Sequence, residues 1–418
     1  MLRKALIAAT VAGSLVTLTA CSGETSSDGG GGGGKTTISF AFWGSNDEAA
    51  AIKSMIAAFE QAHPDVAVEE NWIQGDYEQK LQTAIAGGTA PTVSQISDTS
   101  LPSFARAFQP VDVDSSLYYS PAVAKGGDVG GTNYAVPFVA KSKVMAINRS
   151  LFTAAGLPVP SDTTPMTTQE FVTSAKKLTT GSGAKVYGTA PLWYEGWLIA
   201  EGGSYLSPDG TKCTMGDAAG IRAAQIVGDA TKPGGFAPTR AEAQGQDMVQ
   251  WLADGKIAMM PDFGPWNIAK IAALDPTKFG IVPMPGKGEP MEIDGLGISR
   301  DANEAQTAAA KTFTKFMSSD PAAQNLLAST TSALGVPVVQ SSVDAFKAVA
   351  PSVNLQAFVD AVRNAVPTPH VKDYVAISSQ LSNQWDARTA IGSGKEDPAV
   401  VMPEIQAACQ KLLDAANK

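Results

Sequence analysis

Aromatic and acidic side chains follow several predicted strands in this 418-residue chain. Trp43 comes directly after a predicted strand at 35–42, and Asp98 directly follows another at 92–97. Open α/β sheets bind their ligands at the carboxyl ends of the strands, which is where both residues fall. An aromatic ring can lie against the apolar face of a cyclic solute, while carboxylates accept hydrogen bonds from its hydroxyl groups. These residues therefore predict a site for a small polar solute.

Other residues of the same types stand beside predicted strands or in the loops that follow them. These further candidates are Asn46, Asp47, Trp193, Glu195, Trp197, Phe263 and Trp266. Asn46 and Asp47 have a structural alternative, because either can cap a helix predicted at 47–63 by accepting a backbone N–H. Trp251, in contrast, shares a helical face with Met248 and Leu252, so we expect it in the core.

Composition and motifs exclude several classes of function. The chain carries 31 basic and 40 acidic residues, a net charge of −9, and its basic residues are scattered, which argues against nucleic-acid binding. With three cysteines, two histidines, no Cys-x-x-Cys and no His-Glu-x-x-His, the usual zinc frameworks are absent. We expect neither a metal nor a cofactor.

Two further patterns have to be weighed, one typical of nucleotide binding and one of glycoside hydrolysis. Residues 29–36 match the phosphate-loop pattern G-x-x-x-x-G-K-[ST], but the run precedes a strand, whereas a phosphate loop must follow one and open a helix. Paired carboxylates, such as Asp98 with Glu195 or Asp262, leave a surface glycosidase as an alternative. A glycosidase needs a separation of about 5–9.5 Å between the two carboxyl groups, which the sequence does not give.

The amino-terminal residues predict export. A basic start at Arg3 and Lys4, an apolar run at 5–18 and small residues before Cys21 form a signal peptide at 1–20. The apolar run is too short to span a membrane. Leu18-Thr19-Ala20-Cys21 resembles the bacterial lipobox, which would place an acylated Cys21 at the new amino terminus and anchor the protein to a membrane. A plain secretory peptide is the alternative, and 21–35 is a flexible Gly/Ser tether in either case.

The periodicity beyond the tether predicts an α/β protein. Strands at 35–42, 66–73 and 92–97 alternate with amphipathic helices at 47–63 and 76–86, an order that implies mostly parallel sheets flanked by helices. Further strands are predicted at 134–139, 143–148, 187–190, 257–260, 279–283 and 295–299. Two more helices are predicted, one opened by a capping box of Thr167 and Glu170 and a long one capped by Asp301. Cys213 and Cys409 can pair in an oxidising compartment, but their spacing does not decide this.

Six short sequence motifs are spread along the chain, each occurring once. They are ISFAFWG (38–44), LQTAIAGGTAP (81–91), YAVP with AINRSLF (134–137 and 146–152), FGPW (263–266), DGLGI (294–298) and WDARTAIGSG (385–394). Together they resemble the extracellular solute-binding proteins of ABC importers, in the carbohydrate-binding family that includes maltose-binding protein. The resemblance covers the chain from Lys35 to its carboxyl terminus.

The resemblance implies a two-lobed type II periplasmic-binding-protein fold with the ligand in a hinged cleft. One lobe would hold residues 36–139 and 293–338, and the other 140–292 and 339–418. The protein would be a monomeric binding protein rather than an enzyme, would capture a mono- or oligosaccharide and would deliver it to a membrane permease. A cationic solute such as a polyamine or betaine is the alternative ligand, since it also suits aromatic and acidic side chains.

The resemblance also assigns roles to individual residues. Trp266 matches the family's stacking tryptophan, and Asp98 an acidic sugar-binding position. Trp193, Glu195 and Trp197 match its aromatic and acidic loop. The segment returning beside the cleft matches at Gly295 and Leu296, where a backbone N–H can meet a hydroxyl. The chain departs from the family at Lys141–Ala146, where a more aromatic run is usual.

Overall fold

The computed structural model describes residues 34–180, 186–288, 290–329, 334–367, 371–388 and 396–416. Lys35–Lys418 form one compact unit, separate from Met1–Gly34. The predicted signal peptide, Cys21 and most of the tether lie outside the described residues, as does the WDARTAIGSG phrase beyond residue 388. Within the described ranges, no helix is long and apolar enough to cross a membrane.

The first strands and helices form as the sequence predicts, with each end within one residue of its expected position. They are β1 (Thr36–Phe42), α1 (Asn46–Ala62), β2 (Val66–Trp72), α2 (Tyr77–Ala86) and β3 (Val93–Ser97). Strand β1 lies between β2 and β3 and runs parallel to both, with Thr36 opposite Val66 and Phe40 opposite Val93. This βαβ arrangement places the carboxyl ends of β1 and β3 at one edge of the sheet.

The large sheet is mixed, which corrects the expectation of a mostly parallel one. Its strand order is β11-β6-β10-β3-β1-β2, with β12 paired to β10. Strand β10 (Pro290–Ile298) enters between β3 and β6 (Val136–Lys141) and is antiparallel to both. Only a direct βαβ connection forces neighbouring strands to be parallel, and β10 arrives from a distant part of the chain. Strands β11 (Val336–Pro337) and β12 (Val366–Pro367) complete the sheet.

The second sheet, which was also expected to be mostly parallel, is antiparallel in both strand pairs. Strand β7 (Val144–Asn148) lies between β8 (Met259–Phe263) and β9 (Phe279–Val282). The predicted strand at 187–190 is reduced to a single parallel bridge between Tyr187 and Ile257. Short apolar runs identify these strands but carry no information on their direction.

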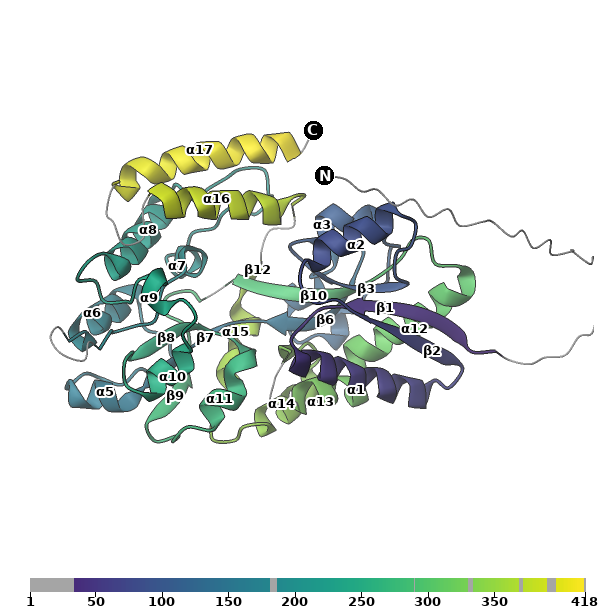
Figure 1. Cartoon of the computed structure of the whole chain (residues 1–418), viewed down its shortest axis with the longest axis horizontal. Coiled ribbons are helices and arrows are strands. Elements are labelled where there is room, and N and C mark those ends of the chain that lie inside the picture. Colours follow the sequence, from purple (N-terminus) through teal and green to yellow (C-terminus); the bar gives the residue numbers. More distant parts are fainter. Residues whose placement is uncertain are drawn as a thin grey trace, which may run out of the picture. The chain divides into compact units, whose positions relative to one another are not determined.

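Helices surround both sheets (Figure 1). Those not yet given are α3 (Leu101–Phe104), α4 (Pro121–Ala124), α5 (Arg149–Ala154), α6 (Thr168–Leu178), α7 (Tyr194–Ala200), α8 (Ala218–Thr231), α9 (Arg240–Ala243), α10 (Met248–Ala253), α11 (Ile268–Ala272), α12 (Glu304–Ser319), α13 (Pro321–Ser329), α14 (Val343–Ala348), α15 (Gln356–Asn364), α16 (Tyr374–Arg388) and α17 (Pro398–Ala416). A two-stranded hairpin joins β4 (Asp128–Val129) to β5 (Thr132–Asn133). Short 3-10 helices occur at 105–107, 115–117, 265–267 and 340–342.

Capping explains where the principal helices begin. The predicted capping box of Thr167 and Glu170 opens α6 as expected. Ser45, rather than Asn46 or Asp47, caps α1, and its side chain pairs with Glu48 in a second capping box. Asn303, not Asp301, caps α12. Each observed cap accepts a backbone N–H that would otherwise have no partner in the first turn.

The large sheet buries an apolar core on each face. Phe40 packs with Phe313 of α12 at 5.1 Å between ring centroids, and Phe59 of α1 meets Phe313 at 5.0 Å. On the other face Ala41 lies in a separate cluster with Leu81 of α2 and Ile96 of β3. The alternation of Phe40 and Ala41 between the clusters follows the two-residue period of a strand.

The last helix is fixed to the rest of the chain by a disulfide bond. Cys213 and Cys409 are bonded, with their Cα atoms 6.0 Å apart and a sequence separation of 196, which answers a question that their spacing left open. Both cysteines are buried. Two side chains of α17 reinforce the contact: Gln410 accepts from the Cys213 N–H at 2.9 Å, and Gln406 from the Gly216 N–H at 2.7 Å.

We expect the disulfide to contribute substantially to the free energy of unfolding. Replacing both cysteines, Cys213→Ala with Cys409→Ala, should lower it by about 2–5 kcal/mol, because the unfolded chain regains the freedom of a long loop. Thermal unfolding with and without a thiol reductant measures this. Reductant should lower the midpoint of the native protein towards that of the double variant and leave the variant unchanged. Equal midpoints for all four samples would show that the bond contributes nothing.

Candidate functional site

A cavity of about 580 Å³ lies where β1 and β3 end. Trp43 follows β1, Ser97 and Thr99 come from the end of β3, and Glu292 from β10. The first turn of α2 and the residue before it also line the cavity, as does Val375 of α16. A neighbouring cavity of about 690 Å³ shares Glu78, Gln79 and Val375 with the first. The expected position at the carboxyl ends of the strands is therefore hollow and polar.

The ring of Trp43 packs against the ring of Tyr77. The two ring centroids are 4.7 Å apart, and the buried Tyr77 hydroxyl donates to the carbonyl oxygens of Gln95 at 2.7 Å and Ala41 at 3.1 Å. Burial raises the pKa of the Tyr77 hydroxyl well above its ordinary value. The Nζ of Lys141 lies 5.2 Å from the centroid of the Trp43 ring. Trp43 is thus fixed beside the cavity, with a cation near its ring.

A buried ion pair lies next to Glu292, one of the residues that line the cavity. Lys141 Nζ is 2.8 Å from Asp294 and 3.5 Å from Glu292, and the side-chain amide of Gln95 donates to Asp294 at 2.8 Å. Burial works against the Lys141 ammonium, but Asp294 and Glu292 outweigh it and raise its pKa. Burial also raises the pKa of Asp294 to about 6, an effect that Lys141 opposes. Lys141 therefore stays charged and forms ion pairs with both carboxylates.

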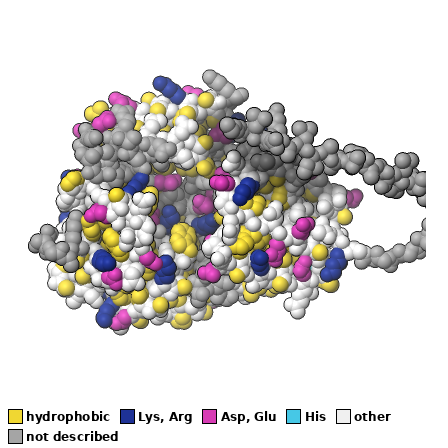
Figure 2. Space-filling view, viewed as in Figure 1, with side chains coloured by type: hydrophobic (Ala, Val, Ile, Leu, Met, Phe, Trp, Pro, Cys, Tyr) yellow, Lys and Arg dark blue, Asp and Glu magenta, His cyan; other side chains and the backbone are white. Residues whose placement is uncertain are grey.

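A second set of charged residues, Glu195, Asp262 and Lys143, interacts electrostatically with Glu292 of the first. The Tyr374 hydroxyl donates to Glu195 at 3.3 Å, and Lys143 Nζ lies 3.8 Å from Asp262. Burial raises the pKa of Glu195; Lys143 and Tyr374 work in the opposite direction, while Glu292 and Asp262 add to the rise. These interactions place Glu195, Asp262 and Glu292 within electrostatic reach of one another. Figure 2 shows acidic and basic side chains gathered in a hollow near the middle of one face of the molecule.

Backbone strain is concentrated around these cavities. Asp76, Asp262 and Asp373 are the non-glycine residues with a left-handed backbone in the described ranges, with φ angles of 49°, 59° and 59°. Asp76 lines the first cavity and Asp373 the second, while Asp262 belongs to the charged group. Such conformations are tolerated best by Asn and Asp and are common at functional sites.

Asp98, the predicted acidic residue at the end of β3, is 1% exposed. Its backbone N–H donates to Ile293 in β10 at 2.8 Å, and its charge contributes to the raised pKa of Tyr374. Asp98 and Glu195 therefore both interact with Tyr374. The structure brings Trp43, Asp98 and Glu195 to one region, although they come from three separate parts of the sequence.

Two other predicted tryptophans have exposed rings. Trp266 is 45% exposed and its ring lies over Gly264, where an added Cβ would stand 2.3 Å from the ring. Trp193 is 50% exposed, and the guanidinium of Arg240 lies 4.7 Å from the centroid of its ring. An aromatic ring presents a flat apolar surface, so both residues can stack on a solute.

The remaining candidates lie in the core or in solvent. Trp197, Phe263 and Leu296 are at most 1% exposed, and the Trp197 ring packs on Phe171 at 4.7 Å. Gly295 lies in the large sheet, and a Cβ added there would be 2.8 Å from that of Ala135. Asn46 and Asp47 lie exposed in the first turn of α1. The structure does not place the side chains of Trp197, Phe263 and Leu296 at the cavity surface.

Several residues of the site were not predicted from the sequence as binding residues. They are Lys141, Lys143, Glu292, Asp294 and Tyr374. Lys141 and Lys143 lie in the segment where the chain departs from the family, and that departure gave no reason to expect a binding role for them. Tyr374 comes from a helix near the carboxyl terminus and had no signal at all.

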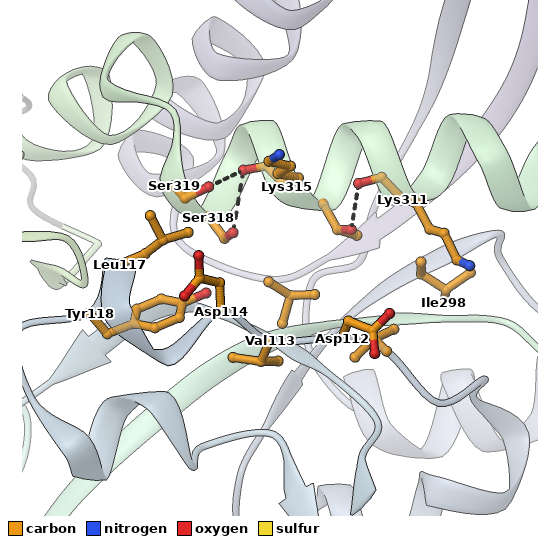
Figure 3. A pocket seen from close by; sticks show the side chains of 13 residues that line it. Asp112, Val113, Asp114, Leu117, Tyr118, Ile298, Lys311, Lys315, Ser318 and Ser319 are labelled. Carbon is orange, nitrogen blue, oxygen red and sulfur yellow. Dashed lines mark hydrogen bonds between the residues drawn. The ribbon is translucent and has the colours of Figure 1, made fainter.

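A cavity of about 310 Å³ lies elsewhere, between residues 111–118 and α12 (Figure 3). None of the predicted site residues lines it. Two of its hydroxyl groups are engaged within α12, because Ser319 and Ser318 donate to the Lys315 carbonyl at 2.8 and 3.4 Å.

Comparisons with known proteins identify the family of this chain. The family of bacterial extracellular solute-binding proteins matches residues 54–357. The chain is 24% identical to the diacetylchitobiose-binding protein DasA of Streptomyces coelicolor, over 99% of each chain.

Solved structures share its fold. The ABC substrate-binding protein Lmo0181 of Listeria monocytogenes, in complex with cycloalternan, has a TM-score of 0.77 at 23% identity, over 91% of this chain and 99% of that one. The sugar-binding protein MalE of Xanthomonas citri has a TM-score of 0.78 at 21% identity, over 91% and 98%. The expected type II fold is therefore confirmed. Since the family match also spans most of its length, this chain belongs to the bacterial extracellular solute-binding proteins.

Proposed function

We propose that the protein captures a carbohydrate outside the cytoplasm and delivers it to the permease of an ABC importer. The observation that carries this proposal is the cavity beside Trp43, which combines an aromatic ring with hydrogen-bonding side chains from Gln79, Ser97, Thr99 and Glu292. Such a combination suits a solute with apolar ring faces and many hydroxyl groups. The sugars bound by DasA and Lmo0181 support the same solute class.

Capture would involve two lobes, residues 36–139 with 293–338 and residues 140–292 with 339–418. The strand pairing supports this division, because the chain passes from β6 of the large sheet directly to β7 of the small sheet. Glu292 and Lys141 lie opposite each other in β10 and β6, close to where the chain would cross between lobes. Closure about these segments would enclose a solute at the base of the cleft.

The protein would act as a monomer held to the outer face of the cell membrane by lipids on Cys21. The lipobox-like residues before Cys21 support the anchor. The disulfide between Cys213 and Cys409 supports an oxidising location outside the cytoplasm. The family is one of binding proteins, which favours delivery of an unaltered solute over hydrolysis by the carboxylates of the site.

Ligand-dependent stabilisation tests the capture of a carbohydrate. A soluble form starting after Cys21 is unfolded thermally in the presence of mono-, di- and trisaccharides, with betaine, amino acids and glycerol phosphate as controls. A sugar at 100 times its dissociation constant should add about 2.7 kcal/mol to the free energy of unfolding. A shift of the midpoint with the charged controls alone would contradict carbohydrate capture.

The exposed ring of Trp266 provides a test of the stacking surface. Trp266→Ala should weaken sugar binding by about 2 kcal/mol, a thirtyfold loss, as is usual for an aromatic residue central to an interface. Gly264→Ala keeps the ring but should displace it, because the new Cβ would lie 2.3 Å from the ring, so it too should weaken binding. Isothermal titration measures both, and thermal unfolding without ligand shows whether each variant is folded. Unchanged affinity in a folded Trp266→Ala variant would exclude this ring from the site.

A further inference from the structure

The charged residues of the site carry more negative than positive charge. Four carboxylates and two lysines form this group: Glu195, Asp262, Glu292, Asp294, Lys141 and Lys143. The Nζ of Lys141 forms ion pairs with the carboxylates of Asp294 and Glu292, at 2.8 and 3.5 Å. Lys143 lies 3.8 Å from Asp262 and also attracts Glu195. A neutral solute would leave this excess of negative charge in place.

The adjoining cavity has the same sign of charge. The charged residues that line the space of about 580 Å³ beside Trp43 are Asp76, Glu78 and Glu292, and no lysine or arginine is among its described lining residues. An anionic solute would be repelled from such a surface, whereas a cation would be attracted to the carboxylates and to the aromatic ring.

The carboxylate of Asp262 has unused hydrogen-bonding capacity. Its side chain is 9% exposed, and neither carboxylate oxygen has a hydrogen-bond partner among the described residues. The Lys143 nitrogen, at 3.8 Å, is farther away than the 2.7–2.9 Å of a charge-assisted hydrogen bond. Its backbone is also left-handed, with φ of 59°. A buried carboxylate without hydrogen bonds costs stability, as does the strained backbone, so the arrangement fits a residue that awaits a ligand.

Lys143 supplies one positive charge to Asp262 and Glu195 but makes no hydrogen bond to Asp262, so an ammonium group of a solute matches the second charge and the hydrogen-bond donors that the two carboxylates still lack. An ammonium group donates three hydrogen bonds and brings one positive charge, whereas a hydroxyl donates one hydrogen bond and brings none. Glu195 already accepts from the Tyr374 hydroxyl at 3.3 Å, which orients its carboxylate. Two carboxylates on separate elements, β8 and α7, thereby frame a position for a cation.

We propose that the captured solute is an amino sugar whose free ammonium group is bound by Asp262 and Glu195. This inference rests on the proposed capture of a carbohydrate and narrows its chemical class. The sugar ring would use the aromatic and polar side chains of the cavity, and the amine would use the excess negative charge. N-acetylation would abolish the charge and with it this contact.

Matched disaccharides test the proposal. The soluble form is titrated calorimetrically with chitobiose, which has free amines, and with diacetylchitobiose and cellobiose, which are neutral, at a pH where the amines are protonated. Chitobiose should bind at least tenfold more tightly than either neutral sugar, and added salt should reduce the difference. Equal or tighter binding of a neutral sugar would overturn the amino-sugar inference and leave carbohydrate capture standing. Binding of putrescine without any sugar would overturn both.

Variants identify the residues responsible. Asp262→Asn removes the charge, keeps the shape and suits a left-handed backbone, so it should fold and lose most of the preference for chitobiose. Asp344→Asn, on a side chain that is 90% exposed, is the matched control and should change nothing. Glu195→Gln is the second variant and should act in the same direction as Asp262→Asn. An equal loss for charged and neutral sugars in both site variants would overturn the role in amine recognition.

Discussion

The ion pair between Lys141 and Asp294 holds three strands together at the base of the site. Lys141 ends β6, Asp294 lies in β10, and Gln95 of β3 donates to the same carboxylate. A buried pair of this kind contributes little net stability, but removing one partner typically costs about 3–5 kcal/mol because the other charge is left uncompensated. The pair therefore fixes the position of β10, and with it Glu292 beside the cavity.

The site is electrostatically costly for the folded protein. Burial raises the pKa of Glu195 and of Asp294, which means that both carboxylates are less stable as charged groups than they would be in water. Asp76, Asp262 and Asp373 adopt left-handed backbones in the same region. Helices packed against the large sheet, with Phe40, Phe59 and Phe313 in contact, supply apolar burial that can offset these costs.

Residues near the carboxyl terminus, remote in sequence from the rest of the site, complete its wall. Tyr374 and Val375 begin α16 and reach Glu195 and the cavity, while the Asp373 N–H donates to the Ser103 hydroxyl at 3.1 Å. Helix α17 packs beside α16 and is bonded through Cys409 to Cys213. The disulfide thus helps to hold α17 and, through it, α16, which contributes Val375 to the cavity wall.

Local sequence determined the first three strands, their two helices and the position of Trp43 and Asp98 at the ends of strands, because the periodicity of apolar residues and the βαβ order are properties of neighbouring residues. The local sequence also contains the lipobox-like motif and the motifs that resemble the family. The antiparallel pairing of β10 and of the second sheet, the disulfide and the burial of Trp197 and Phe263 were decided by tertiary structure. So was the charged group, since Lys141, Glu195, Asp262, Glu292 and Tyr374 meet only when β10 and α16 return from distant parts of the chain. Electrostatic and packing interactions act through space, and a linear pattern of residues does not contain those distances.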